Sequence, residues 1–153
     1  EHLSGTDQKE MLGNPDGYKN RSFNPFYGSS HKFNGFMDYF NTNGNWANSV
    51  GLNDIFASIR YSKRNFELNL TGHAFLTAAS VIKDGNVNET MEPFLGAEVD
   101  LTMSYKLSNT SNVVLGYSQM FGSETLQAIK GGDNAAWNNY AYLMFTFKPV
   151  FLK

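Results

Sequence analysis

Two carboxylates, Glu98 and Asp100, stand two residues apart in a segment whose apolar and polar residues alternate. In an extended strand this spacing places both on one face, because successive side chains point to opposite sides. Paired carboxylates can carry general acid and base catalysis, and His73, from another alternating segment, could approach them. We interpret the pair as part of a hydrated wall.

His73 could also form a serine–histidine pair of the kind found in hydrolases. His73 with Ser118 or Ser104 has the composition of a hydrolase pair, but neither serine lies in a nucleophile motif. The segments 5–17 and 84–93 collect carboxylate and Asn side chains, which can bind Ca²⁺, yet neither has the spacing of an EF-hand. The sequence therefore predicts no enzyme, no catalytic residue, no metal site and no cofactor.

The segments that must position these residues show the period of two that is typical of strands. Five of them follow residue 51: 53–62, 65–76, 95–107, 112–121 and roughly 138–151. In 95–107 every residue from Leu95 to Leu107 on one face is apolar, and no charge falls on that face. The chain is predicted to be all-β.

The opposite, polar face collects the charged residues of all five segments. We predict that it lines an aqueous lumen, with these residues facing the pore: Asp54, Arg60, Glu67, His73, Glu98, Asp100, Lys106 and Lys148.

Three features favour a transmembrane barrel over a soluble sheet. The segments run ten to fourteen residues, whereas soluble strands cluster near ~5–6 and a tilted membrane strand needs ~9–11. Tight turns at 62–65 and 108–112 alternate with long loops at 41–51, 78–93 and 122–137, as in outer-membrane barrels. Aromatic residues expected at the lipid interface lie near the tight turns: Tyr61, Phe66, Tyr105 and Phe147.

The predicted fold is a transmembrane antiparallel up-and-down β-barrel in the bacterial outer membrane. A Lys or Arg at mid-bilayer on the lipid face would cost ~2–4 kcal/mol, which explains the uncharged face. Charged residues make up only 17% of the chain, no cysteine occurs, and no run reaches the ~18–20 apolar residues of a membrane helix. The net charge of −2 predicts no nucleic-acid partner.

The chain divides into a long extracellular loop, residues 1–51, and C-terminal barrel strands, residues 52–153. A preceding strand is expected to end at about Glu1-His2-Leu3. The loop contains the aromatic segment "NPFYGSSHKFNGFMDYF", residues 24–40, which is too rich in Phe and Tyr to stay in water. It either packs as a lid on the barrel wall or folds into the lumen as a constriction that presents His31, Lys32 and Asp38.

Five strands cannot close a barrel, because open edges would leave backbone groups unpaired in hydrocarbon. The predicted partners are therefore the lipid bilayer, the remaining strands of the same barrel or of partner chains, and small solutes.

Several stretches together resemble the C-terminal region of the alginate-export-like outer-membrane porins of Gram-negative bacteria. They are "FNPFYGSSHKFNGFMDYF" (23–40), "GLNDIFASIRYS" (51–62), "GYSQMFGSETLQAIKGG" (116–132) and "WNNYAYLMFTFKPVF" (137–151). The resemblance implies a monomeric barrel of many strands that passes solutes through a polar lumen. Because the predicted lumen carries charges of both signs, a general or nutrient-uptake porin fits better than an exporter of anionic polysaccharide.

Two alternatives stay open at the level of sequence. One is a soluble β-sandwich that binds carbohydrate through its aromatic loops, and the other is an outer-membrane barrel that acts as a structural scaffold in a complex.

Electrophoresis and detergent partitioning can distinguish the hypothesis of a membrane barrel from that of a soluble sandwich. We expect native material to partition into detergent, to migrate as a heat-modifiable band on unboiled gels, and to have a mass above 17.1 kDa. A water-soluble particle of that mass would contradict the barrel prediction.

Overall fold

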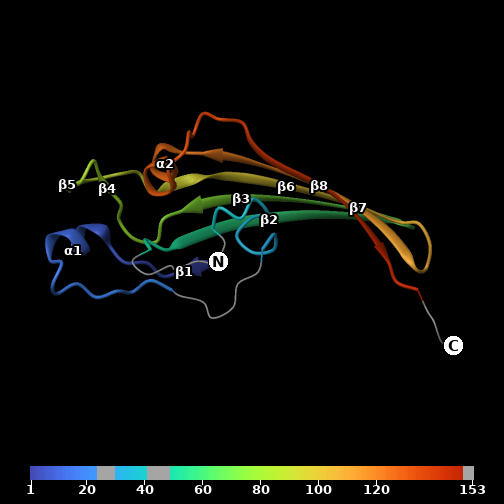
Figure 1. Ribbon diagram of the computed structural model, residues 1–153, viewed down its shortest axis with the longest axis horizontal. Helices are drawn as coiled ribbons and strands as arrows, with labels where there is room; N and C mark the ends of the chain where they lie inside the picture. The colour runs from blue at the N-terminus through green and yellow to red at the C-terminus, as the bar shows by residue number, and fades with distance from the viewer. Residues whose placement is uncertain (24–29, 41–48, 150–153) are drawn as a thin grey trace.

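A computed structural model of the chain describes residues 1–23, 30–40 and 49–149. Its elements are β1 (His2–Leu3), α1 (Gln8–Gly13), β2 (Leu52–Lys63), β3 (Phe66–Leu76), β4 (Ile82–Lys83), β5 (Asn86–Thr90), β6 (Phe94–Lys106), β7 (Ser111–Gly122), α2 (Glu124–Lys130) and β8 (Asn138–Phe147). Figure 1 shows that most of them form one long, curved sheet. Its strand order is β1-β2-β3-β6-β7-β8, with every neighbouring pair antiparallel.

The five long strands confirm the prediction of an all-β, antiparallel, up-and-down arrangement. Strands β2 and β3 pair without a break from Asn53↔Leu76 to Lys63↔Phe66, so the predicted tight turn at 62–65 is real. A second tight turn joins β6 to β7. The predicted last strand, 138–151, is too long, because β8 ends at Phe147 and residues 150–153 lie outside the described part of the chain.

The sheet is open rather than closed, with β1 and β8 as its two edges. The short β1 pairs His2 with Asn53 and Leu3 with Leu52. This pairing confirms that the first residues belong to a strand antiparallel to β2, as the sequence predicted.

The long loops contain more regular structure than the sequence analysis predicted. Loop 78–93 holds the β4–β5 hairpin, and loop 122–137 holds helix α2. The Ser123 side chain accepts a hydrogen bond from the Leu126 N–H and so caps α2, and Gly131 ends the helix at a φ of 75°. Such short helices are set by their caps rather than by periodicity, so a search for strand alternation overlooks them. No helix in the described residues is long and apolar enough to cross a membrane.

The two faces of the sheet have opposite characters. The apolar face is exposed: Ile59 and Leu143 are each 73% exposed and Phe145 is 62% exposed. The charged residues of the polar face are buried toward the long-loop end, where Asp54, Glu98 and Asp100 are at most 2% exposed. A soluble sheet has the reverse distribution.

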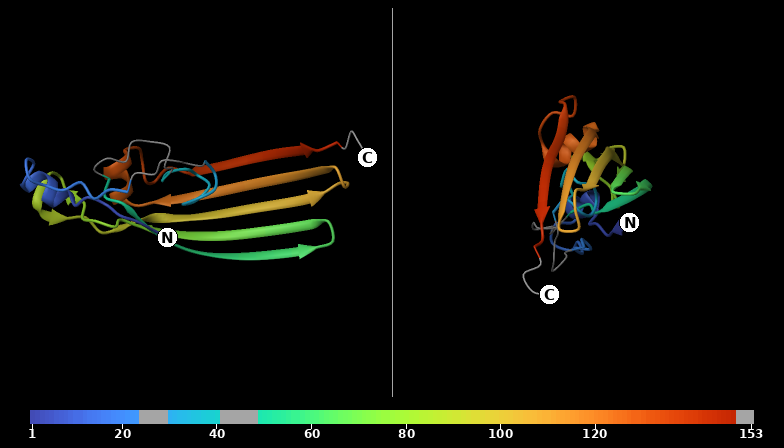
Figure 2. Two further views of the ribbon diagram at one scale, coloured as in Figure 1. Left: turned by 90° about the horizontal axis from the view of Figure 1, so that it is seen from below. Right: turned by 90° about the vertical axis from the view of Figure 1, so that its right-hand side faces the viewer.

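The buried apolar residues gather at the long-loop end of the sheet, on the side where the chain folds back over the strands. This cluster contains Leu3, Phe40, Leu52, Phe75, Leu95, Met120 and Leu126. Figure 2 shows α1, α2 and the β4–β5 hairpin at this end, while the strands extend uncovered toward the tight turns.

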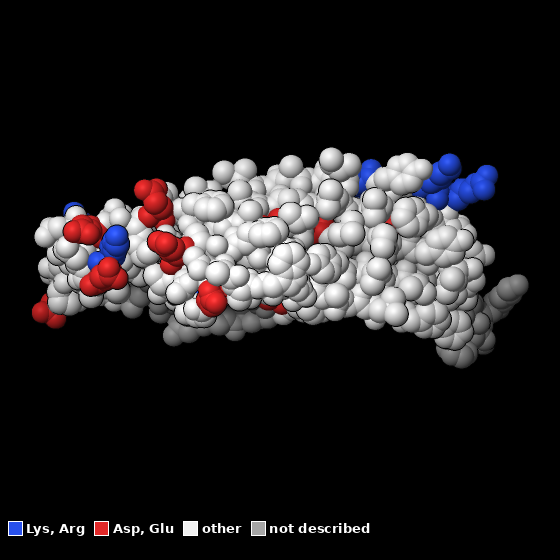
Figure 3. Space-filling model, turned by 90° about the horizontal axis from the view of Figure 1, so that it is seen from above, with Lys and Arg blue, Asp and Glu red and all other residues white. Residues whose placement is uncertain are grey.

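Charge is also sorted by end. In Figure 3, several Lys and Arg gather at the tight-turn end, and the long-loop end carries most of the visible Asp and Glu together with a few Lys and Arg. Within the five long strands, the only charged side chain on the apolar face is Lys63, at the end of β2. The middle of that face is uncharged, as the sequence predicted.

Asp7 gives a testable prediction about the long-loop end. Its carboxylate caps α1 by accepting hydrogen bonds from the Lys9 and Glu10 N–H groups, at 2.8 and 3.1 Å. Partial burial acts to raise the pKa of Asp7, but these bonds and contacts with Ser80 outweigh burial and hold the pKa below its ordinary value. We expect Asp7→Ala to destabilise α1 by about 1 kcal/mol, measured as faster amide exchange at Lys9 and Glu10.

The sign of the pH effect follows from the lowered pKa. The stabilisation is fully present above the ordinary Asp pKa of about 3.9 and is lost as the pH falls through the folded-state pKa. Asp7→Asn is the matched control, since Asn caps helices as well as Asp does but does not titrate. Equal acid sensitivity of exchange in the wild type and in Asp7→Asn would contradict this role.

Candidate functional site: the polar face

The polar face brings together all the residues predicted to line a lumen. The strand register fixes this, because Asp54 lies opposite Phe75, His73 opposite Glu98, and Asp100 opposite Ser118. Seven of the eight lie on one side of β2, β3 and β6, and Lys148 follows β8 at the same end as Lys106. The structure therefore places the eight charged or titratable side chains on a common surface.

His73 is the centre of a buried polar cluster near the long-loop end. Its Nδ1 atom lies 2.9 Å from Asp54 Oδ1, and its Nε2 atom lies 3.6 Å from Asp100 Oδ2. The ring stacks between Phe56 and Phe75, with centroid distances of 5.5 and 5.4 Å. Because both ring nitrogens face carboxylates, His73 is held as a fixed part of the wall.

This geometry does not form either of the serine–histidine pairs considered from sequence. The Ser104 hydroxyl instead donates to Asn112 Oδ1 at 3.1 Å. The Ser118 hydroxyl is buried and has no hydrogen-bond partner in the described structure. Within the described residues, no three His, Cys, Asp or Glu side chains are arranged to hold a metal ion together.

Residues 30–40 of the aromatic segment lie against the polar face. The Met37 N–H donates to Glu98 Oε1 at 2.8 Å, across sixty-one residues of sequence. The His31 ring stacks on Tyr140 at 4.9 Å and 8°, and Phe40 contacts Phe75 at 4.6 Å. These contacts attach the segment to β3, β6 and β8. Residues 24–29 of the aromatic segment lie outside the described chain.

The segment turns back on itself through left-handed backbone conformations. Positive φ angles occur at His31, Asn34, Gly35 and Asp38, with values of 50°, 57°, 86° and 59°. The Asp38 carboxylate accepts a hydrogen bond from the His31 N–H at 2.7 Å and lies 2.9 Å from His31 Nδ1. Two of the three residues predicted to face solute are thus paired with each other.

Lys32, the third predicted constriction residue, differs from the other two. Its side chain is exposed and its Nζ atom lies 5.0 Å from the centre of the Phe33 ring.

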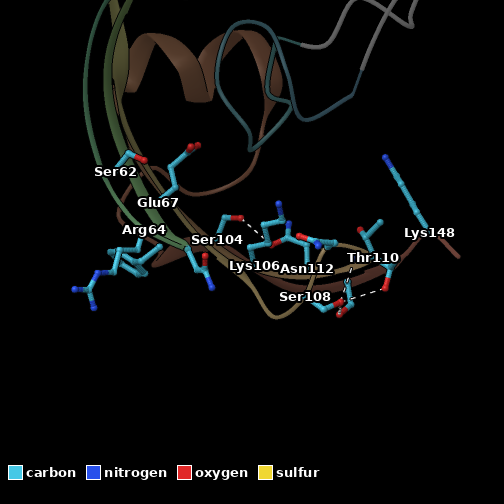
Figure 4. A pocket seen from close by; sticks show the side chains of 14 residues that line it. Ser62, Arg64, Glu67, Ser104, Lys106, Ser108, Thr110, Asn112 and Lys148 are labelled. Atoms are coloured by element: carbon cyan, nitrogen blue, oxygen red, sulfur yellow. Dashed lines mark hydrogen bonds between the residues drawn. The ribbon is translucent and has the colours of Figure 1, made fainter. Parts of the chain in front are cut away.

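The tight-turn end of the polar face is open and basic. A hollow of about 450 Å³ is lined there by Arg64, Lys106 and Lys148 together with Ser, Thr and Asn side chains. Figure 4 shows Lys106 among these polar groups and Lys148 at the far side of the hollow. Arg60 pairs with Glu67 at 2.5 Å nearby, which offsets one of the positive charges. The face thus runs from buried carboxylates at one end to exposed cations at the other.

The four aromatic residues predicted for a lipid interface lie on the apolar face near the tight turns. Phe66 pairs with Tyr105, and Phe147 pairs with Ser111 at the start of β7. Tyr61, Tyr105 and Phe147 are at least half exposed. They form one band across the sheet.

The sequence analysis did not identify the residues that hold residues 30–40 against the polar face. Tyr140, which stacks on His31, lies in the predicted strand 138–151, and the alternation of that strand does not indicate this contact. Gly35 and Asn34 gave no periodic signal, because their importance comes from positive φ angles and from contact with a strand distant in sequence.

Comparison with family models, curated proteins and solved structures gives no match. The resemblance to alginate-export-like porins remains a prediction from the sequence.

Gly35 provides a test of how the segment is held. A Cβ atom at this position would lie 2.6 Å from Glu98 Oε2, and the backbone φ of 86° is unfavourable for other residues. We expect Gly35→Ala to weaken the attachment of residues 30–40 by roughly 1–3 kcal/mol. Amide exchange at Met37, whose N–H donates to Glu98, measures the effect.

Gly13→Ala is the matched control, because a Cβ atom at Gly13 would meet no other atom within 4 Å. Unchanged exchange at Met37 in Gly35→Ala would show that Glu98 does not anchor the segment.

Proposed function

We propose that the sheet is part of an outer-membrane β-barrel of the porin class, whose polar face borders a pore for passive passage of small polar or charged solutes. The observation that carries this proposal is the inverted distribution of side chains, with apolar residues exposed on one face and carboxylates buried on the other. Lipid around the barrel would cover the exposed apolar face. The bacterial outer membrane is therefore the proposed location.

The dimensions of the strands support this placement. The long strands contain 10 to 13 residues, and a tilted strand needs ~9–11 residues to span the hydrocarbon. The aromatic band near the tight turns corresponds to one interface, and the uncharged middle of the apolar face corresponds to the hydrocarbon. By analogy with other barrels, the tight turns would face the periplasm and the long loops the outside.

The open edges require further strands. Exposed N–H and C=O groups on β1 and β8 cannot be left unpaired in lipid. Remaining strands of the same barrel or strands of partner chains would satisfy them. Residues 30–40, attached by Glu98 and Tyr140, would then narrow the pore near its outer end.

The charge distribution supports passage of polar solutes more than selection of one sign. On the polar face, Asp54, Glu98 and Asp100 lie near the long-loop end, and Lys106 and Lys148 lie near the tight turns. This arrangement would create a field along the pore that orients dipolar solutes. Over the described residues, it provides no continuous path of positive charge for an anionic polymer such as alginate.

A non-conducting scaffold is the second candidate. It is favoured by the way residues 30–40 cover the polar face over Glu98 and Phe75. The soluble carbohydrate-binding sandwich is less well supported, because no second layer covers the apolar face in the described residues.

Cysteine accessibility distinguishes a pore wall from a lipid-facing wall. The chain has no native cysteine, so Ser104→Cys on the polar face and Met103→Cys on the apolar face can be compared directly. We expect a charged methanethiosulfonate reagent to change single-channel conductance in Ser104→Cys and to leave Met103→Cys unchanged. The measurement is made on the protein in planar bilayers.

Three other outcomes would contradict the pore. Equal effects at both positions would show that the two faces do not separate water from lipid. A membrane-inserted protein without conductance would favour the scaffold. A protein that stays soluble without detergent would favour the sandwich.

A further inference from the structure

Several buried oxygen atoms beneath residues 30–40 have no hydrogen-bond partner in the described structure. They are Asn34 Oδ1, Glu98 Oε2, Asp100 Oδ1, Asp100 Oδ2 and Ser118 Oγ. All four residues are at most 4% exposed. A buried polar atom without a partner is costly, and each one requires an explanation such as an ion or water. Here all the atoms are oxygens.

The four residues adjoin one another. The Glu98 and Asp100 carboxyl groups lie on one face of β6, two residues apart. Neither can donate a hydrogen bond when both are ionised. Ser118 is the partner of Asp100 in the β6–β7 register, and Asn34 precedes Gly35, which lies directly over the Glu98 carboxylate. The unpartnered oxygens therefore come from one small region.

Basic side chains are scarce around the carboxyl groups of this region. Asp54, Glu98 and Asp100 are all buried, and among the described residues His73 is the only basic side chain that pairs with their carboxyl groups. None of the ion pairs among the described residues joins a Lys or Arg to these carboxylates. Buried carboxylates of this kind repel one another unless a positive charge lies between them.

We propose that Glu98, Asp100, Asn34 and Ser118 bind a hard divalent cation of the Ca²⁺ type. Two carboxylates match its charge, and the amide and hydroxyl oxygens complete a donor set that contains oxygen alone. The set lacks the nitrogen and sulfur ligands that transition metals prefer.

Glu98 would then have two separate roles. Its Oε1 atom accepts the hydrogen bond from Met37 that holds residues 30–40, and its Oε2 atom faces the cation. The cation would strengthen the attachment of the segment to the sheet. The site does not depend on the proposed pore, because every donor belongs to the chain described here.

The test is cation binding by the purified protein in detergent after removal of metals with a chelator. We expect saturable Ca²⁺ binding by calorimetry and Tyr-sensitised Tb³⁺ luminescence that Ca²⁺ displaces, since Tyr140 lies opposite Ser118. Glu98→Gln and Asp100→Asn should weaken binding about tenfold or more. Both replacements keep an oxygen acceptor and nearly the same shape.

Two further variants test whether any loss of binding is specific to the four proposed ligands. Glu67→Gln removes a carboxylate from the same face that is paired with Arg60 and 39% exposed, and should leave the affinity unchanged. Ser118→Ala is the mildest change to the donor set and should weaken binding by a smaller factor. It keeps the proposal testable if a carboxylate variant fails to fold.

Three results would overturn the proposal. The first is the absence of saturable Ca²⁺ or Tb³⁺ binding in the wild type. The second is an unchanged affinity for Ca²⁺ in Asp100→Asn, which would show that the ion binds to exposed loop carboxylates. The third is a wild-type protein that acid stabilises and Ca²⁺ does not, while acid has no such effect on Asp100→Asn. That result would show that Glu98 and Asp100 share a proton instead of a cation.

Discussion

The strict alternation of side chains along five paired strands is the constraint on which the rest of the structure depends. Because neighbouring strands keep their register over ten or more residues, an apolar residue at one position fixes the face of every residue on that strand. A slip of one residue in β6 would turn Glu98 and Asp100 into the exposed apolar face. The separation of apolar and charged residues onto two faces therefore stabilises the strand register, and that register in turn keeps the two faces separate.

The polar face is organised by a second interaction, between the Glu98 carboxylate and the backbone of residues 30–40. A buried carboxylate needs hydrogen-bond donors, and a turn rich in positive φ angles presents N–H groups that regular structure does not use. Each therefore satisfies a requirement of the other. Phe40 of the segment then packs on Phe75 and His31 stacks on Tyr140, whereas Phe33 stays 53% exposed.

Different parts of the molecule were predictable to different degrees, for physical reasons. The strands could be predicted because period-two alternation is a local property, and the tight turn at Lys63 lies where the alternation breaks. Helices α1 and α2 were missed, because six or seven residues held by single caps at Asp7 and Ser123 leave little periodic signal. The stacking of His31 on Tyr140 joins residues more than a hundred positions apart, and no local pattern encodes it.

The sequence by itself determined the strands, their two faces and the set of charged residues that share the polar face, because alternation and turn chemistry act over a few residues. Only the tertiary structure decided which of those residues meet: His73 between Asp54 and Asp100, Glu98 beneath Gly35, and Lys106 beside the open hollow. It also decided that residues 30–40 lie on the polar face. These contacts depend on strand order, register and the path of a long connection, which are set by the packing of the whole chain.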